Sequence, residues 1–159
     1  MIDVPFLSYE QLKRTAETTL GDSASAGRIP VDIELIVERD FRIEIIPFRG
    51  LQDRFSIDAF ISQDAKSISV DEFVLENRIT RYRFSLAHEL GHRVLHERIL
   101  KSMNFPTIQD WKSQIGQIPE REYRFLEYQA NTFANAYFCP QLIWMQGSRK
   151  LLSKFVKLA

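Results

Sequence analysis

Helical periodicity is strongest between residues 77 and 100, where apolar side chains recur every three or four positions. This spacing predicts an amphipathic helix with one buried face and one face open to a cleft. We expect the helix to begin between Asn77 and Arg81 and to end near Leu100. Its apolar stripe comprises Phe84, Ala87, Leu90, Val94 and Leu95.

Three further segments have the signals of helices. Ser8 stands three residues before Gln11, a spacing typical of a capping box, and the helix it opens should stop at Gly21. Pro30 suits the first turn of a second helix over residues 31–39. Pro119 and the acids after it favour a third helix, running to about Phe138, with apolar residues on most of its faces.

Alternating apolar and polar residues predict three strands, at residues 41–45, 55–61 and 67–70. Pro47 and Gly50 should end the first strand, and residues 63–66 should form a turn between the other two. We therefore expect an α+β fold, in which a small antiparallel three-stranded sheet packs beside the helix at residues 77–100 and the helix at residues 118–138.

Two segments fall outside this scheme. Residues 101–118 show few periodic positions, so we expect an irregular connection that serves as a mobile flap over a cleft, with Trp111 as its anchor or as a substrate contact. Residues 148–159 predict a basic amphipathic helix, which either packs on the core or forms a docking surface for a partner.

Composition narrows the class of protein. A chain of 159 residues with 45% hydrophobic residues suits a single globular domain, residues 1–159, with its core at about residues 30–145. Acidic and basic residues number 21 each, which argues against direct nucleic-acid binding. The single cysteine cannot form an internal disulfide, and no signal-peptide pattern or membrane-length apolar run occurs. We expect a cytoplasmic protein without a membrane partner.

The candidate chemistry lies in the helix at residues 77–100, which contains all three histidines of the chain. His88 and His92 are four residues apart, so they lie one turn apart on the same helical face and can hold one Zn²⁺ through a nitrogen each. Glu89 follows the first histidine, where a carboxylate can act as a general base toward a water beside the ion. This His-Glu-x-x-His spacing predicts a zinc hydrolase.

Two histidines are too few for a catalytic zinc site, which normally has three protein ligands. His96 is about 12 Å along the helix axis from His88, so we expect it to be a packed or hydrogen-bonded neighbour of the site. A carboxylate should supply the third ligand. Glu127 is the best candidate, because Asn131 one turn later can bond a ring N–H of a ligating histidine. The rival acids are Glu72, Glu76, Glu120 and Glu122.

A developing oxyanion needs a hydrogen-bond donor as well as the ion. Spacing does not choose among the available tyrosines, which are Tyr82, Tyr123, Tyr128 and Tyr137.

The two motifs resemble those of the ImmA/IrrE family of metallopeptidases. The first is the segment 83–96, which reads RFSLAHELGHRVLH, and the second is the segment 127–134, which reads EYQANTFA and is followed by Pro140. The strand pair expected over residues 57–70 also fits, and the resemblance covers about residues 30–145.

The resemblance implies a small gluzincin-like fold, zinc bound by His88, His92 and Glu127, and Glu89 as the catalytic base. It further implies cleavage or inactivation of a helix-turn-helix repressor, as in stress responses, mobile elements or toxin–antitoxin-like pairs of bacteria and phages. The chain shows no helix-turn-helix pattern of its own, so we expect the repressor on a separate chain. The alternative is a regulator that keeps the metal site and binds its partner without cutting it.

Overall fold

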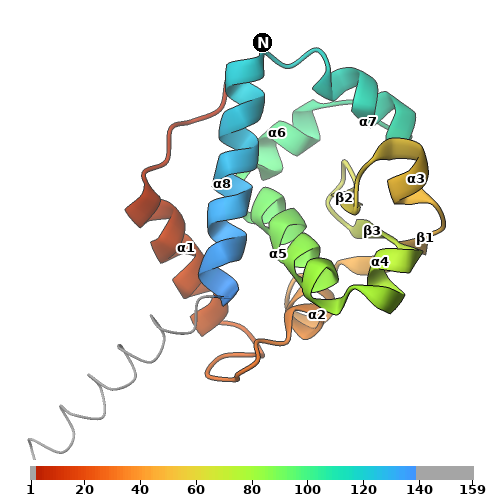
Figure 1. Ribbon diagram of the computed structural model, residues 1–159. Coiled ribbons are helices and arrows are strands. Elements are labelled where there is room, and N and C mark those ends of the chain that lie inside the picture. Colours follow the sequence, from red (N-terminus) through yellow and green to blue (C-terminus); the bar gives the residue numbers. More distant parts are fainter. Residues whose placement is uncertain (1–2, 139–159) are drawn as a thin grey trace, which may run out of the picture.

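The structure, a computed structural model, describes residues 3–138. Figure 1 shows α1 (Tyr9–Gly21) and α5 (Ile79–Leu95) on opposite sides of α8 (Glu120–Phe138), with the sheet beyond α5. The expected α+β class is confirmed. Helix α5 is therefore the central element, packed against α8 on one side and against strand β2 (Ala59–Ile61) on the other.

The three-stranded sheet is mixed, and the expectation of an antiparallel sheet was wrong for one pair. Strand β3 (Ser67–Asp71) lies in the middle, antiparallel to β2 and parallel to β1 (Glu44–Phe48). Pro47 lies inside β1, where it was expected to end the strand. The position tolerates proline because β1 is an edge strand, so one side of its backbone needs no ladder partner.

The second predicted strand is shorter than its alternating pattern. Residues 51–55 form helix α3 (Leu51–Phe55), and only Ala59–Ile61 pair with β3. Gly50 and Ser56, at the two ends of α3, have left-handed backbone angles (φ 75° and 58°) that turn the chain out of any extended strand. Leu51 is fully buried and fixes the helix on the sheet.

The expected helix with the histidines is confirmed, but it ends earlier than predicted. It runs over α5, stops at His96, and is followed by α6 (Glu97–Ser102). Before it lies the short helix α4 (Glu72–Asn77), capped by the Asp71 carboxylate on the Val74 amide (3.1 Å).

The expectation of an irregular segment at residues 101–118 was wrong in part. Helix α7 (Ile108–Ile115) occupies its second half and begins with a reciprocal capping box between Thr107 and Asp110.

Two of the remaining helix predictions are confirmed. The capping box of Ser8 and Gln11 opens α1, and α8 runs through Phe138. The second predicted helix begins later than expected: Asp32 caps α2 (Ile33–Leu35), which continues as the π-helical segment η1 (Ile36–Asp40). The predicted basic helix at residues 148–159 lies outside the described residues.

The segment before α1 lies across α8. The Val4 amide donates to the Glu122 carboxylate (3.0 Å), and the Pro5 carbonyl accepts from the Gln129 side chain (2.8 Å). Val4 is buried against the core. Among the described helices, none combines the length and apolarity needed to cross a bilayer.

Candidate metal centre

Helix α5 presents the two histidines of the motif to a cavity. The Nε2 atoms of His88 and His92 lie 3.1 Å apart, as expected for residues one turn apart on one face. The opposite face of the helix is buried by Leu86, Ala87 and Leu90.

Helix α8 brings Glu127 to the same point. One carboxylate oxygen lies 3.4 Å from the His88 Nε2, and the other lies 3.6 Å from the His92 Nε2. These are the residues of the described chain whose ligand atoms gather within 4.8 Å of one another. Tetrahedral Zn²⁺ with bonds of about 2.0–2.1 Å separates its ligand atoms by about 3.3–3.4 Å. The three observed separations bracket that value, so the set fits a zinc ion.

The outer nitrogens of both rings have partners on the side away from the cavity. Asn131 Oδ1 lies 3.1 Å from the His88 Nδ1, and His96 Nδ1 lies 3.0 Å from the His92 Nδ1. A neutral imidazole carries one N–H, and in each ring that N–H can serve the outer partner. Both Nε2 lone pairs then face the Glu127 carboxylate. Three acceptors without a donor among them form a site that attracts a cation.

The charges of the ligand residues reinforce this picture. Burial alone would raise the pKa of Glu127, but the two histidine rings beside it hold that pKa well below its usual range. Burial would lower the pKa of His88, yet Glu127 and Glu89, with the Asn131 bond, raise it. The carboxylate is therefore ionised in the presence of its neighbours, as a metal ligand must be.

Glu89 lies beside the cluster and is 8% exposed. Its Oε2 accepts a hydrogen bond of 2.9 Å from the Ile61 amide of β2. Burial raises the pKa of Glu89, and nearby Glu127 raises it further, against the lowering effects of His88, His92 and the Ile61 amide. A carboxyl whose pKa is moved toward neutrality is suited to exchange protons in a reaction.

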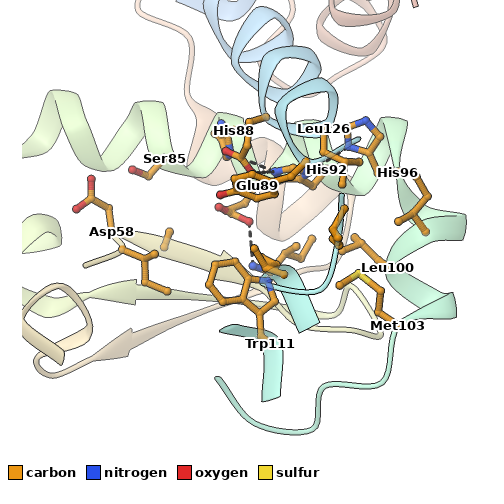
Figure 2. A pocket seen from close by; sticks show the side chains of 18 of the residues that line it. Asp58, Ser85, His88, Glu89, His92, His96, Leu100, Met103, Trp111 and Leu126 are labelled. Atoms are coloured by element: carbon orange, nitrogen blue, oxygen red, sulfur yellow. Dashed lines mark hydrogen bonds and ion pairs between the residues drawn. The ribbon is translucent and has the colours of Figure 1, made fainter. Parts of the chain in front are cut away.

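The cluster lines a cavity of about 260 Å³. Figure 2 shows Glu89 near its middle, with Asp58 and Ser85 toward one end and Leu100 and Met103 toward the other. Helix α7 adds Trp111, whose ring lies 6.1 Å from that of Phe60 on β2. One end of the cavity is therefore polar, and the other is lined by apolar side chains.

The structure separates the candidate tyrosines. Tyr123 lines the cavity, and its pKa is raised by burial and by the charges of Glu127 and Glu89. Tyr128 is 52% exposed and lies outside the cavity lining. Tyr137 and Tyr82 are buried in the core, away from the lining residues. Of the candidate oxyanion donors, Tyr123 therefore lines the cavity, whereas Tyr128 and Tyr137 do not.

The rival acids are placed elsewhere as well. Glu122 accepts the Val4 amide, and Glu120 lies near Arg124 on the exposed face of α8. Glu72 belongs to the first turn of α4, and Glu76 is exposed near the end of the same helix. None of these four carboxylates lines the cavity.

Close contact between α5 and α8 depends on Gly91. A methyl group at this position would lie 3.2 Å from the Ala130 Cα, 3.2 Å from the Phe133 ring and 3.3 Å from the Ala130 carbonyl oxygen. Two of these atoms belong to the α8 backbone, which cannot rotate away as a side chain can. Ala130 is also one turn from Glu127, so a displacement of α8 moves the carboxylate relative to the histidines.

We expect Gly91→Ala to weaken zinc binding measurably while the protein still folds. The overpacking costs about 1–3 kcal/mol, and the better helix propensity of alanine offsets about 1 kcal/mol of it. Gly21→Ala is the matched control, because no atom lies within 4 Å of a methyl group there. Zinc affinity is measured by competition with a chelator. Equal zinc affinities of Gly91→Ala and Gly21→Ala would contradict the inference that the site depends on the close contact of α5 and α8 at Gly91.

Comparison with known protein families agrees with this geometry. Residues 72–141 match the family described as Peptidase_M78: IrrE N-terminal-like domain. The match covers 70 of the 159 residues, and this part of the chain is similar to that family. The match runs from α4 to just beyond α8, so the IrrE N-terminal-like region contains all three candidate ligands and Glu89. No curated protein and no solved structure matched the chain.

The similarity of residues 72–141 to the IrrE N-terminal-like domain supports a metallopeptidase-type domain. A peptidase of this kind implies a metal cofactor, and His88, His92 and Glu127 form a possible site for it. The matched region excludes the sheet, whose strand β2 supplies the amide that contacts Glu89.

Proposed function

We propose that the protein is a zinc-dependent endopeptidase, and that its substrate is a helix-turn-helix repressor carried on a separate chain. The observation that carries the proposal is the convergence of His88, His92 and Glu127 beside a buried Glu89. A purely structural zinc site is closed by four protein ligands and has no use for an adjacent base. The choice of a repressor rests on the family resemblance of the two motifs.

The ion would be held by His88, His92 and Glu127, and when bound it supplies a Lewis acid that polarises a peptide carbonyl and acidifies water. Glu89 takes the proton of the attacking water and passes it to the leaving nitrogen. The Ile61 amide holds the Glu89 carboxylate in place at 2.9 Å. Tyr123 lines the cavity, and in this proposal its hydroxyl donates to the developing oxyanion.

The substrate backbone has a binding edge in β2. The Ser62 amide donates to the Ser67 carbonyl, and the Asp71 amide donates to the Asp58 carbonyl. In and beside β2, the backbone N–H and C=O groups of even-numbered residues therefore point toward β3. The backbone groups of Ala59 and Ile61 therefore face away from the sheet, on the side of Glu89. We infer that an extended substrate segment pairs with this edge, through the Ala59 amide and carbonyl and the Ile61 carbonyl.

The apolar end of the cavity is suited to a substrate side chain. Leu100, Met103 and Leu126 are largely buried there, and Trp111 and Ile115 of α7 line the same end. A polar side chain placed there would lose its hydration without gaining hydrogen bonds, whereas a large apolar one would gain contacts. We therefore expect cleavage next to a bulky apolar residue.

The direct test incubates the zinc-loaded protein with the helix-turn-helix repressors encoded near its gene. The expected result is cleavage at a small number of sites, mapped by mass spectrometry, each beside a large apolar residue. A chelator should abolish the cleavage, and added zinc should restore it, because the chelated protein lacks the Lewis acid.

The control for this test is an unrelated unfolded protein of similar size, which separates repressor recognition from general proteolysis. Equal cleavage of both proteins would support peptidase activity but contradict specificity for a repressor. The absence of any chelator-sensitive cleavage in either protein would contradict the proposed peptidase activity.

A further inference from the structure

Behind His92 lies a buried chain of hydrogen bonds that ends at the N-terminal segment. His96 Nδ1 lies 3.0 Å from the His92 Nδ1, and His96 Nε2 lies 2.9 Å from the Gln129 Oε1. Gln129 Nε2 then donates to the Pro5 carbonyl at 2.8 Å. His96 and Gln129 are each 1% exposed, so water cannot take the place of a missing partner.

The Pro5 carbonyl fixes the direction of every bond in this chain. A carbonyl only accepts, so Gln129 must turn its NH₂ group toward Pro5 and its oxygen toward His96. The Gln129 oxygen in turn requires an N–H from His96, which places the proton of His96 on Nε2. His96 is 1% exposed, and its ring nitrogens contact Gln129 and His92 rather than a carboxylate, so no anion balances a charge on the buried ring. His96 Nδ1 is therefore a lone pair.

The consequence for His92 is a single tautomer. Its Nδ1 faces the lone pair of His96, so in the neutral ring Nδ1 carries the proton and Nε2 is bare. Without a metal, the Glu127 carboxylate favours the opposite tautomer of His92, because an Nε2–H would point at this carboxylate, 3.6 Å away. The buried chain opposes that alternative and keeps the ligand atom free.

We propose that His96 and Gln129 are positioning residues that hold His92 as the Nδ1–H tautomer, with the direction set by the Pro5 carbonyl. The cation site is thereby coupled to the docking of the N-terminal segment on α8. His88 differs, since its outer partner Asn131 is an exposed side chain that water can replace. The inference rests on the metal site of the proposed function and not on peptide hydrolysis.

Two substitutions at His96 separate positioning from simple packing. In His96→Gln, the amide NH₂ can donate to Gln129 and the amide oxygen can accept from His92, so the direction of the chain is kept. In His96→Leu, both bonds are lost at similar volume. Loss of an outer hydrogen-bond partner typically lowers metal affinity by about 10–100-fold. We expect that loss for His96→Leu and a value within a few-fold of wild type for His96→Gln.

The deciding measurement is made on the full-length protein without metal. Histidine ring ¹⁵N shifts from two-bond ¹H–¹⁵N spectra at neutral pH identify the tautomer of each ring. We expect wild type and His96→Gln to show the His92 proton on Nδ1, and His96→Leu to show a population with the proton on Nε2. A His92 proton on Nε2 in the wild type would overturn the proposal, and this result needs no variant.

Zinc affinity, measured by chelator competition, supplies the second readout. Equal losses in His96→Gln and His96→Leu would also overturn the proposal, because they would assign His96 a packing role. Both measurements are independent of cleavage, so failure to find a substrate would leave them unaffected. A wild-type affinity in His96→Leu would reject the coupling even if the protein proved to be a peptidase.

Discussion

Glu89→Gln should lower peptide hydrolysis by at least about 10²–10⁴-fold, the contribution expected of a positioned general base. The amide cannot take a proton from the attacking water, so the step loses its base. The fold should persist, because the amide oxygen can still accept from the Ile61 N–H that now contacts the Glu89 Oε2. Zinc should remain bound, since Glu89 is not among the three candidate ligands.

The measurement compares single-turnover cleavage rates at equal zinc content, with the metal quantified in both proteins. The same variant separates the two candidate functions. If repressor inactivation survives Glu89→Gln, binding alone is sufficient and the protein is a non-catalytic regulator. If inactivation disappears while zinc and repressor binding persist, hydrolysis is the function.

Glu127→Gln should remove most of the zinc affinity, by more than the roughly 10–100-fold expected for loss of an outer hydrogen-bond partner. The substitution keeps the size of the side chain but replaces an ionised carboxylate by a neutral amide. In the present structure, that carboxylate lies 3.4 Å from the His88 Nε2 and 3.6 Å from the His92 Nε2, and it is the only negative ligand of the set.

Glu120→Gln is the matched control for this prediction, since Glu120 lies in the first turn of the same helix with an 86% exposed side chain. Isothermal titration with zinc should give a wild-type affinity for the control and little or no binding for Glu127→Gln. Wild-type affinity in Glu127→Gln would mean that another group closes the site, and the assignment of the third ligand would be wrong.

The sequence predicted those parts of the molecule that depend on local spacing. The i, i+4 relation of His88 and His92 is a property of any α-helix, and the capping box at Ser8 is satisfied within four residues. Glu127 was also within reach, because an acid on a largely apolar helix requires a partner. These inferences needed no knowledge of how distant segments pack.

The missed features depend on tertiary structure or on weaker local signals. Alternation identifies a strand but not its direction, so the parallel pairing of β1 with β3 could not be predicted from it. Helix α7 did have local signals, the Thr107–Asp110 capping box and the helical spacing of Ile108, Trp111 and Ile115, but it is only eight residues long. The role of Gln129 was missed because only the folded chain brings Pro5, 124 residues away, against it.

The division of the candidate ligands between α5 and α8 has a thermodynamic consequence. An ion that binds only when both helices are docked shifts the unfolding equilibrium toward the native state by mass action, about 2.7 kcal/mol at a free ion concentration 100 times the dissociation constant. Zinc supply would then govern how much of this protein persists in the cell, because depletion would leave the α5–α8 contact to its own apolar packing. Metal scarcity would act on the abundance of the protein as well as on its chemistry.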